Sequence, residues 1–263
     1  QMWTRRYAKR TIESYLYWIK GFILFNDKKH PEQCHNVEVE QFLTYLTTRQ
    51  NLAPKTQAVA LSALVFLYKE ILKAPLSLEL NFNKSNVQPK LPVVLTQEEV
   101  ARFFDKISAN YMLPSKLMYG SGLRLMETVR LRVQDIDFDY LSVMVWHSKG
   151  GKHRRVTLAK ELVEPLRKQI GIAELYYQQD LKNSDYQGVW LPHALSRKYP
   201  FAPKELGWQY LFPSSRLSID PAKKMLRRHH IDETCLRKFV KKAAKNANID
   251  KHVTCHTLRH SFA

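Results

Sequence analysis

The chain has 263 residues, with 42 Lys and Arg against 24 Asp and Glu, and therefore a formal net charge of +18 at pH 7. A length above about 250 residues favours two domains, and 44% hydrophobic residues suffice for a substantial core. The cationic excess favours a polyanionic partner, and nucleic acid is favoured over a membrane surface because no single strongly amphipathic basic segment dominates.

Three amphipathic helices are predicted within residues 1–80. Apolar residues recur with helical spacing over residues 11–25, 39–46 and 61–72, and the third helix starts near Pro54, a residue suited to a first helical turn. Residues 1–80 should therefore form a small helical domain. Cations cluster just before the first predicted helix, at Arg5, Arg6, Lys9 and Arg10.

Residues 81–94 are predicted to link this domain to a second one over residues 95–263. The linker loses the helical period, turns polar and contains two prolines. Thr96 and Glu99 then form a capping-box pattern, in which each side chain accepts a bond from the backbone N–H of the other residue. The second domain therefore opens with a helix.

The second domain is expected to be mainly helical with a small β-hairpin. Over residues 141–158 the apolar period changes to two on both sides of the Gly150-Gly151 turn. Helical period returns over residues 160–182 and 233–246. Between these helices, residues 183–232 contain five prolines and no steady period. They predict an insertion built on loops.

Three motifs of the second domain together suit the handling of a phosphodiester. They are Gly120-Ser-Gly-Leu-Arg124-Leu-Met-Glu127, Ser148-Lys149-Gly150-Gly151-Lys152 and His256-Thr-Leu-Arg259. Phosphoryl transfer without a metal needs cations on the non-bridging oxygens and an acid for the departing 5′ oxygen. Arginine suits the first task because its planar fork pairs with two oxygens and stays charged. Lys149, at the tip of a hairpin, suits the second.

Each motif also has an ordinary structural interpretation. Arg124 and Glu127 could form a weak, exposed i,i+3 ion pair. Lys149 could be a solvated turn lysine in a basic hairpin that contacts a DNA groove. The other DNA-contacting candidates of that hairpin are Lys152 and Arg154. The combination and order of the three motifs favour the functional interpretation.

In this order the motifs resemble the catalytic residues of the tyrosine recombinase (phage integrase) family. Lys149 follows Arg124 by 25 residues, and His256 follows Arg124 by 132 residues. The resemblance implies that Arg124 and Arg259 bind the scissile phosphate, that Lys149 is the general acid and that His256 assists proton transfer. Glu127 would support Arg124.

The same resemblance implies a two-domain, C-shaped clamp on DNA. Residues 1–80 look like the family's SAM-like core-binding domain, and residues 95–263 look like most of its catalytic domain. Neither a metal nor an energy cofactor is implied. The implied assembly is a homotetramer on paired recombination sites.

A narrower resemblance is to the integron integrases. His256 lies 107 residues beyond Lys149, and that branch carries a helix-bearing insertion in this interval, where it recognises bases extruded from a folded single strand. Aromatic side chains beside cations can stack on unpaired bases. Trp208 is the stacking candidate, and His229 and His230 are candidate phosphate or base contacts. Alternatively, Trp208 anchors the insertion and the basic segment faces solvent.

The family's nucleophilic tyrosine lies beyond His-x-x-Arg, whereas all 13 tyrosines of this chain precede Arg259. We therefore expect a C-terminally truncated copy or an incomplete reading frame that binds DNA and does not cleave it. Gln1 is an unusual first residue and hints at a trimmed N-terminus. A non-catalytic DNA-binding or architectural protein remains an alternative.

The remaining predictions concern metal binding, the redox compartment and membrane contact. A zinc site is a weaker alternative, since His252, Cys255, His256 and His260 lie within nine residues but the cysteines are unpaired. The scattered cysteines suit a reducing compartment. There is no apolar run of membrane-spanning length and no secretion signal in residues 1–30. A cytoplasmic protein that contacts no membrane is therefore expected.

Overall fold

The computed structural model describes residues 2, 4–5, 7–77, 79–88, 91–146, 152–221 and 223–262. The chain divides into two compact units, Gln1–Leu91 and Pro92–Ala263. The division falls inside the segment predicted to be a linker. Much of that segment nevertheless belongs to the first unit, because its polar groups find partners there.

Two residues show how the polar segment is held on the first unit. The carbonyl of Asn83 accepts hydrogen bonds from Thr47 Oγ1 at 3.0 Å and from Gln57 Nε2 at 2.8 Å. The hydroxyl of Ser85 donates to the carbonyl of Leu52 at 2.6 Å. In this part of the chain, the loss of helical period therefore corresponds to an extended segment that is hydrogen-bonded to the first unit.

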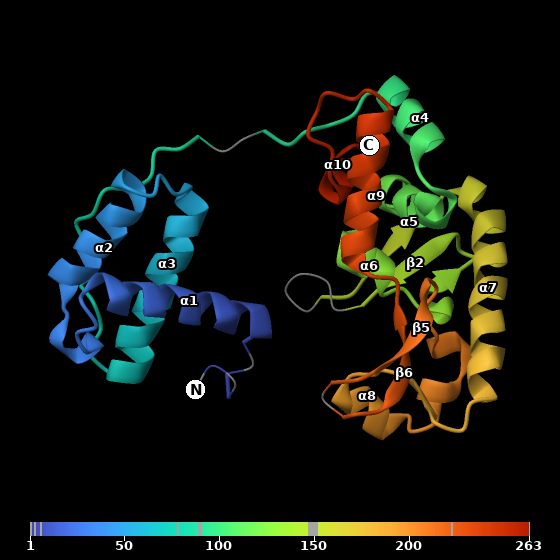
Figure 1. The fold of residues 1–263 in the computed structure, drawn as a ribbon, viewed down its shortest axis with the longest axis horizontal. Helices are drawn as coiled ribbons and strands as arrows, with labels where there is room; N and C mark the ends of the chain where they lie inside the picture. The colour runs from blue at the N-terminus through green and yellow to red at the C-terminus, as the bar shows by residue number, and fades with distance from the viewer. Residues whose placement is uncertain are drawn as a thin grey trace. The chain divides into compact units, whose positions relative to one another are not determined.

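The first unit contains the three predicted helices (Figure 1). They are α1 (Lys9–Phe25), α2 (Asn36–Thr48) and α3 (Pro54–Phe66), and α3 continues as a π-helical stretch over Leu67–Leu72. Pro54 begins α3 as predicted. The apolar faces of the helices meet in one core around Phe22, Leu43 and Leu64, which are fully buried.

The second unit is mainly helical, with two small sheets. Its helices are α4 (Gln97–Lys106), α5 (Ala109–Gly120), α6 (Leu125–Val129), α7 (Val163–Leu181), α8 (His193–Lys198), α9 (Glu233–Asn246) and α10 (Cys255–His260). The first sheet joins β1 (Ile136–Asp137), β2 (Ser142–Val145) and β3 (Arg154–Thr157), all antiparallel. The predicted hairpin is β2–β3, and the predicted capping box of α4 is present at Thr96 and Glu99.

The prediction that residues 183–232 are built on loops is wrong. They contain a second sheet in the order β4-β6-β5, formed by β4 (Tyr186–Val189), β5 (Pro213–Ile219) and β6 (Leu226–His230), together with α8. The central strand β6 has the sequence Leu-Arg-Arg-His-His, so the side chains buried on its inner face are polar. An apolar alternation of period two therefore does not arise.

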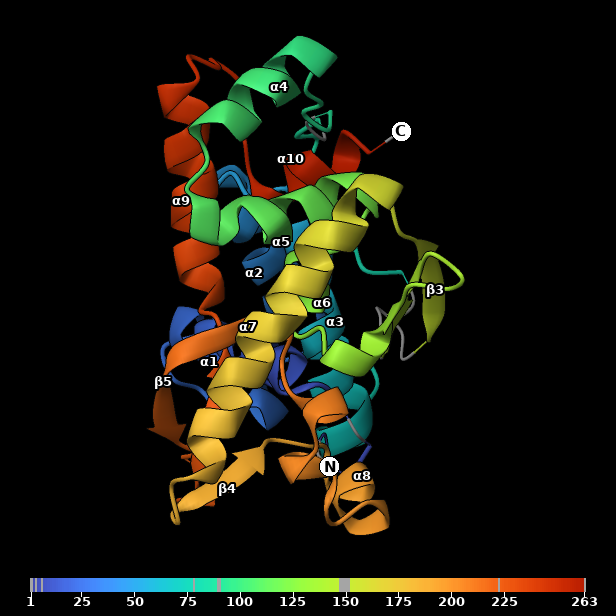
Figure 2. The ribbon, with the colours of Figure 1, turned by 90° about the vertical axis from the view of Figure 1, so that its right-hand side faces the viewer.

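Helix α7 connects the two sheets of the second unit. It runs past both of them (Figures 1 and 2). Its Leu166 is fully buried in the core of the first sheet. Near its other end, Asp180 accepts a hydrogen bond from Arg228 of β6 at 2.8 Å, and both side chains are buried. The insertion is thus fixed to the same helix as the first sheet.

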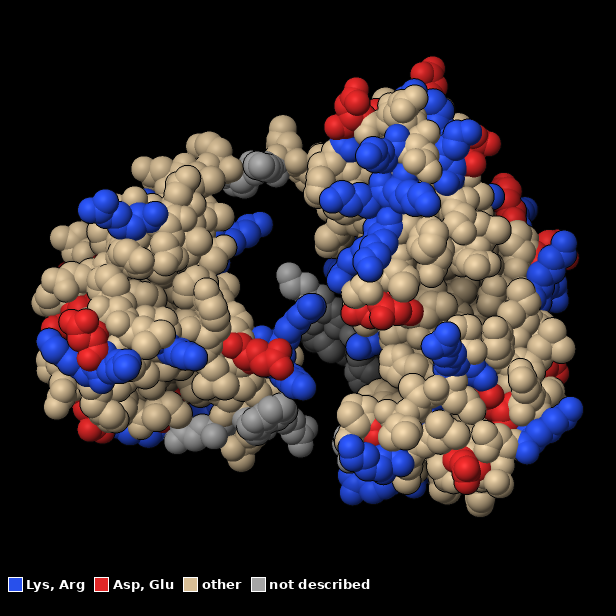
Figure 3. Space-filling model, in the orientation of Figure 1, with Lys and Arg blue, Asp and Glu red and all other residues tan. Residues whose placement is uncertain are grey.

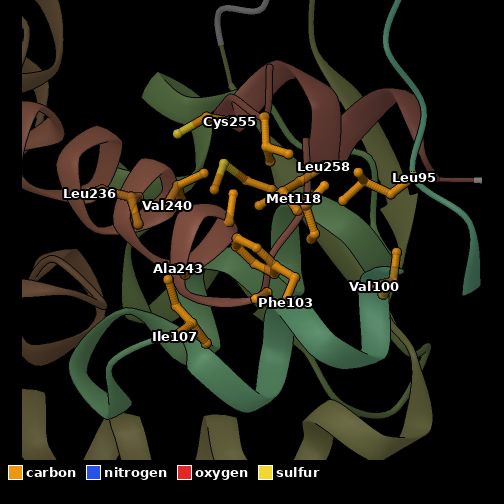
Figure 4. Packing of buried hydrophobic residues seen from close by; sticks show 14 of the residues in the cluster. Leu95, Val100, Phe103, Ile107, Met118, Leu236, Val240, Ala243, Cys255 and Leu258 are labelled. Carbon is orange, nitrogen blue, oxygen red and sulfur yellow. The ribbon is translucent and has the colours of Figure 1, made fainter. Parts of the chain in front are cut away.

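A helical core fixes the C-terminal part of the second unit. Phe103 of α4, Met118 of α5, Val240 of α9 and Leu258 of α10 are fully buried and converge there (Figure 4). The hydroxyl of Ser261, directly after α10, accepts a hydrogen bond from the backbone N–H of Leu95 at 2.9 Å. Helix α10 is therefore held against the beginning of the same unit.

Candidate phosphate-binding site

Arg124 and Glu127 form a capping box at the start of α6. The backbone N–H of Arg124 donates to Glu127 Oε2 at 2.8 Å, and Arg124 Nη1 donates to Glu127 Oε1 at 2.8 Å. Gly122, two residues earlier, has a φ of +60°, a left-handed conformation that favours glycine. A methyl group there would also lie 3.0 Å from the ring of Phe262. The left-handed turn at Gly122 thus sets the direction in which the backbone reaches Arg124 at the start of α6.

A second arginine, from β3, binds the same carboxylate. Arg154, at the start of β3, donates from Nη1 to Glu127 Oε1 at 2.8 Å and from Nη2 to Oε2 at 2.6 Å. Its side chain is only 28% exposed. The sequence suggested that Arg154 contacts DNA, but the structure commits its guanidinium to Glu127. The pattern of residues offered no signal for this pair, because its members are 27 positions apart.

A third arginine comes from α10. Arg259 Nη1 donates to the carbonyl of Gly122 and lies 3.9 Å from Glu127 Oε2. Burial and then the charge of Arg124 lower the pKa of Arg259 from its ordinary value, as expected for cations gathered in one place. The spacing of His256 and Arg259 places both on α10, which Thr254 caps by accepting from the N–H of Thr257 at 3.2 Å.

His256 is exposed on α10, with its ring centroid 5.4 Å from that of His260. Partial burial of the ring, followed by the positive charges of His260, Arg259 and Arg124, lowers its pKa. The imidazole is therefore neutral near pH 7, the form in which one ring nitrogen can accept a proton.

The electrostatics of the cluster centre on Glu127, whose side chain is 9% exposed. Burial opposes its ionisation, but hydrogen bonds from Arg154 and from the backbone and side chain of Arg124 outweigh burial and lower the pKa to about 2. The carboxylate is thus ionised at neutral pH. Three guanidinium groups around one carboxylate leave a net charge of +2, which suits a phosphodiester.

Several predicted contacts lie elsewhere or cannot be placed. Lys149 and Arg6 lie outside the described residues. Lys152 and Arg10 are exposed. In the first unit, Arg5 pairs with Glu70 at 2.5 Å and Lys9 lies 3.9 Å from Glu13.

The paired histidines of the insertion differ in their surroundings. His229 is exposed, whereas His230 is only 6% exposed, its Nδ1 lies 2.7 Å from the carbonyl oxygen of Ile231, and its ring meets Tyr210 edge-on. His230 is therefore much less accessible to nucleic acid than His229, and its contact with nucleic acid stays a prediction. Side chains alternate between the faces of a strand, so only one of two consecutive histidines can point outward.

Trp208 is half-buried and contacts both the insertion and the rest of the second unit. Its ring lies 6.1 Å from that of Tyr199 and 5.9 Å from the guanidinium of Arg132. Arg132 also donates to the carbonyls of Trp208 and, at 2.8 Å, of Trp190. These contacts show that Trp208 takes part in anchoring the insertion.

Helix α9 carries a band of cations on its exposed face. Figure 3 shows Lys and Arg gathered over this helix. The exposed cations are Arg237, Lys238, Lys241, Lys242 and Lys245. None of them takes part in the ion pairs of the described residues. Like charges four residues apart destabilise a helix by repulsion. A polyanionic ligand would offset this repulsion, so the band suits such a ligand.

Two other classes of site find no support in the described parts of the chain. No three His, Cys, Asp or Glu side chains in those parts are arranged to hold a metal ion. Among the helices there, none combines the length and the apolar character needed to cross a bilayer.

Comparison with known proteins identifies the family. Residues 1–78 match the phage integrase N-terminal SAM-like domain, and residues 93–263 match the phage integrase family. The chain belongs to the phage integrase family. It is 37% identical over 257 residues to an integrase/recombinase of Escherichia coli and to one of Pseudomonas aeruginosa, covering 98% of this chain and 76% of each relative.

The solved structures agree on the fold. A lambda integrase dimer bound to a COC′ core site matches with a TM-score of 0.64 at 14% identity, over 99% of this chain and 83% of that one. By its family, the protein is a site-specific tyrosine recombinase that acts on DNA. The arginine cluster lies within residues 93–263, the part of the chain that matches the phage integrase family.

Proposed function

We propose that the protein cuts and rejoins DNA at specific sites by metal-free phosphoryl transfer through a 3′-phosphotyrosyl intermediate. The observation that carries the proposal is the meeting of Arg124 and Arg259, from α6 and α10, at the single carboxylate of Glu127. Two guanidinium groups held this way can bind both non-bridging oxygens as negative charge develops on them.

The chemical step assigns one task to each group. A tyrosine phenolate oxygen attacks phosphorus, the bond from phosphorus to the 5′ oxygen breaks, and the departing oxygen takes a proton from Lys149. His256, neutral near pH 7, assists proton transfer. Family resemblance puts the nucleophilic tyrosine downstream of Arg259, a position that none of the 13 tyrosines of residues 1–263 occupies. These 263 residues should therefore bind DNA without forming a covalent adduct.

We further propose that the protein resembles the integron branch and works on folded single-stranded sites as well as duplex DNA. The support is an insertion over residues 183–232 that presents Trp208 and the exposed His229 close to cations. Residues 1–80 and 95–263 would close on DNA as a clamp, joined by residues 81–94, with four copies on paired sites. DNA in the cytoplasm is the proposed substrate.

A nicked suicide duplex bearing a recombination site of an integrase/recombinase relative tests the proposal. The 263-residue chain is incubated with it, then analysed on a native gel for binding and on a denaturing gel for adduct. Binding without adduct supports the proposal. A covalent adduct would show that an upstream tyrosine attacks, and absence of binding would overturn the DNA-binding function.

The alternative is a DNA-binding protein that never cleaves. The cationic band on α9 fits this function equally well, since it needs no chemistry. Fusing a tyrosine-bearing C-terminal segment of a tyrosine recombinase after residue 263 separates the two. Cleavage by the extended chain, abolished by Arg124→Ala, supports the recombinase; binding without cleavage supports the alternative.

A further inference from the structure

The proposed function leaves Arg154 without a task. The residue lies on β3 and the sequence suggested that it contacts DNA, yet both of its terminal nitrogens bond to Glu127, at 2.8 and 2.6 Å. Such a two-pronged pair fixes the plane of the carboxylate, because both oxygens are held at once.

Both oxygens of the Glu127 carboxylate accept hydrogen bonds from Arg124 and from Arg154. Oε1 accepts from Nη1 of Arg124 and from Nη1 of Arg154, and Oε2 accepts from the backbone N–H of Arg124 and from Nη2 of Arg154. A carboxylate offers about four lone-pair positions. The orientation of Glu127 therefore decides where the guanidinium of Arg124 lies.

We infer that Arg154 is a positioning residue of the phosphate site: it orients Glu127, and through Glu127 it places Arg124 and Arg259, instead of binding DNA itself. The inference rests on the proposed function, because it presumes that these two arginines bind the scissile phosphate. It also connects β3, the strand that follows the Lys149 turn, to α6 and α10 through one carboxylate.

Removal of Arg154 should change the site by more than one charge. Glu127 would keep its negative charge in a buried position and lose the two hydrogen bonds that Arg154 donates. Arg259 Nη1, already 3.9 Å away, and Arg124 would move toward the unsatisfied oxygens. Both would then be withdrawn from the phosphate.

Arg154→Lys separates positioning from direct phosphate binding. Lysine keeps the charge but cannot occupy two oxygens with the geometry of a guanidinium fork. Direct binding of a phosphate would largely survive this change, whereas the orientation of Glu127 would not. Arg155→Lys is the matched control, since Arg155 is the next residue of β3, is 53% exposed and lies 3.9 Å from Asp137.

The measurement is the affinity for a duplex of mixed sequence, about three helical turns long, as a function of salt. The slope of log K against log salt concentration is negative, and its magnitude falls by about 0.9 for each phosphate that the protein no longer neutralises. A lowered slope means a smaller magnitude. We expect Arg154→Lys and Arg154→Gln to lower the slope equally, each by more than about one unit, and to weaken binding at least about tenfold. Arg155→Lys should stay within about twofold of the unchanged protein.

Arg124→Gln distinguishes the two possible failures. If this variant keeps the full slope, the cluster does not bind backbone phosphate and the proposed site fails. If Arg124→Gln lowers the slope while Arg154→Lys binds as the unchanged protein does, only the positioning role of Arg154 is overturned.

Glu127→Asp provides the second test, for the case in which the arginine variants fail to fold. It keeps every charge of the cluster and shortens the side chain by one methylene, so the carboxylate cannot reach both arginines. A positioning role predicts a lowered slope in a protein with unchanged near-ultraviolet circular dichroism. An unchanged slope would overturn the role.

Discussion

At the scale of a residue, Glu127 links the proposed phosphate site to the stability of the fold. Its pKa of about 2 in the folded protein lies below its ordinary value, so the stabilisation is present above about pH 4.5 and disappears as the pH falls toward 2. We expect the free energy of unfolding to fall by about 3 kcal/mol over that window.

Urea unfolding at a series of pH values, with the unchanged protein and Glu127→Gln, measures this effect. The amide does not titrate, so the variant should be less stable at pH 7 and less dependent on pH between about 5 and 2. Equal dependence in both proteins would show that other carboxylates cause the acid unfolding.

His230 predicts a separate effect at higher pH. Burial lowers its pKa to about 4, which means that the folded protein holds the ring neutral while the unfolded chain protonates near pH 6.5. Stability should therefore be full above about pH 6.5 and decline by about 3 kcal/mol as the pH falls toward 4.

His230→Phe tests this prediction, because phenylalanine keeps an aromatic ring against Tyr210 and cannot titrate. The variant should show a shallower decline of the free energy of unfolding between about pH 6.5 and 4.5 in the same urea experiment. A decline as steep as that of the unchanged protein would assign the effect to another group.

At the scale of an element, the insertion shows what the pattern of residues can reveal. Its position and its aromatic and basic character could be predicted, but its sheet could not. Strand β6 buries Arg228 and His230, whose polar groups are satisfied by Asp180 and by the backbone. Hydrophobic periodicity detects apolar burial, so a strand that buries a salt bridge and a histidine escapes it.

Trp208 tests whether the insertion acts on extruded bases. Trp208→Ala should weaken binding to a DNA hairpin with extruded bases about tenfold, which corresponds to about 1 to 3 kcal/mol of stacking, and should weaken binding to plain duplex much less. Gel-shift titrations with both probes measure the difference. Equal weakening on both probes would mean that the contacts of Trp208 with Tyr199 and Arg132 serve only to anchor the insertion.

Helix α5 is a second element that was not predicted. Pro114 lies inside it, and its sequence lacks a clear apolar stripe. The flanking helix α4 was predicted because its capping box and its periodic apolar residues agree. Elements whose local signals conflict become helical through tertiary packing, here of Leu117 and Met118, which are fully buried.

At the scale of the whole molecule, the net charge of +18 is unevenly used. The cationic band of α9 should bind phosphates, whereas lysines of equal exposure at α7 should not. We expect Arg237→Gln, Lys241→Gln and Lys245→Gln, combined, to lower the salt slope of DNA binding by about 3 units.

The control combines Lys160→Gln, Lys168→Gln and Lys182→Gln, which remove the same charge from α7 and its two ends. This triple variant should change the slope by less than about one unit. If both triple variants reduce affinity and slope alike, the protein binds DNA through its overall charge and not through α9.

The two-unit organisation could be predicted from changes of period and composition, because those signals are local. The assembly of the phosphate site could be predicted only in part. Arg124, Glu127 and Arg259 stand in short motifs, but the pair between Glu127 and Arg154 depends on how β3 packs against α6. No spacing in the sequence expresses that packing.

The hydrogen bond between Leu95 and Ser261 has a consequence for the order of events during synthesis. It closes a loop of 166 positions and holds the helix that carries Arg259. At ribosomal rates of about 5–20 residues per second, on the order of ten seconds separate the synthesis of Glu127 from that of Arg259. During that time α9 and α10 are missing from the core, so a nascent chain, although already cationic, does not yet hold the three arginines together. The proposed phosphate site would thus form only after the second unit has closed.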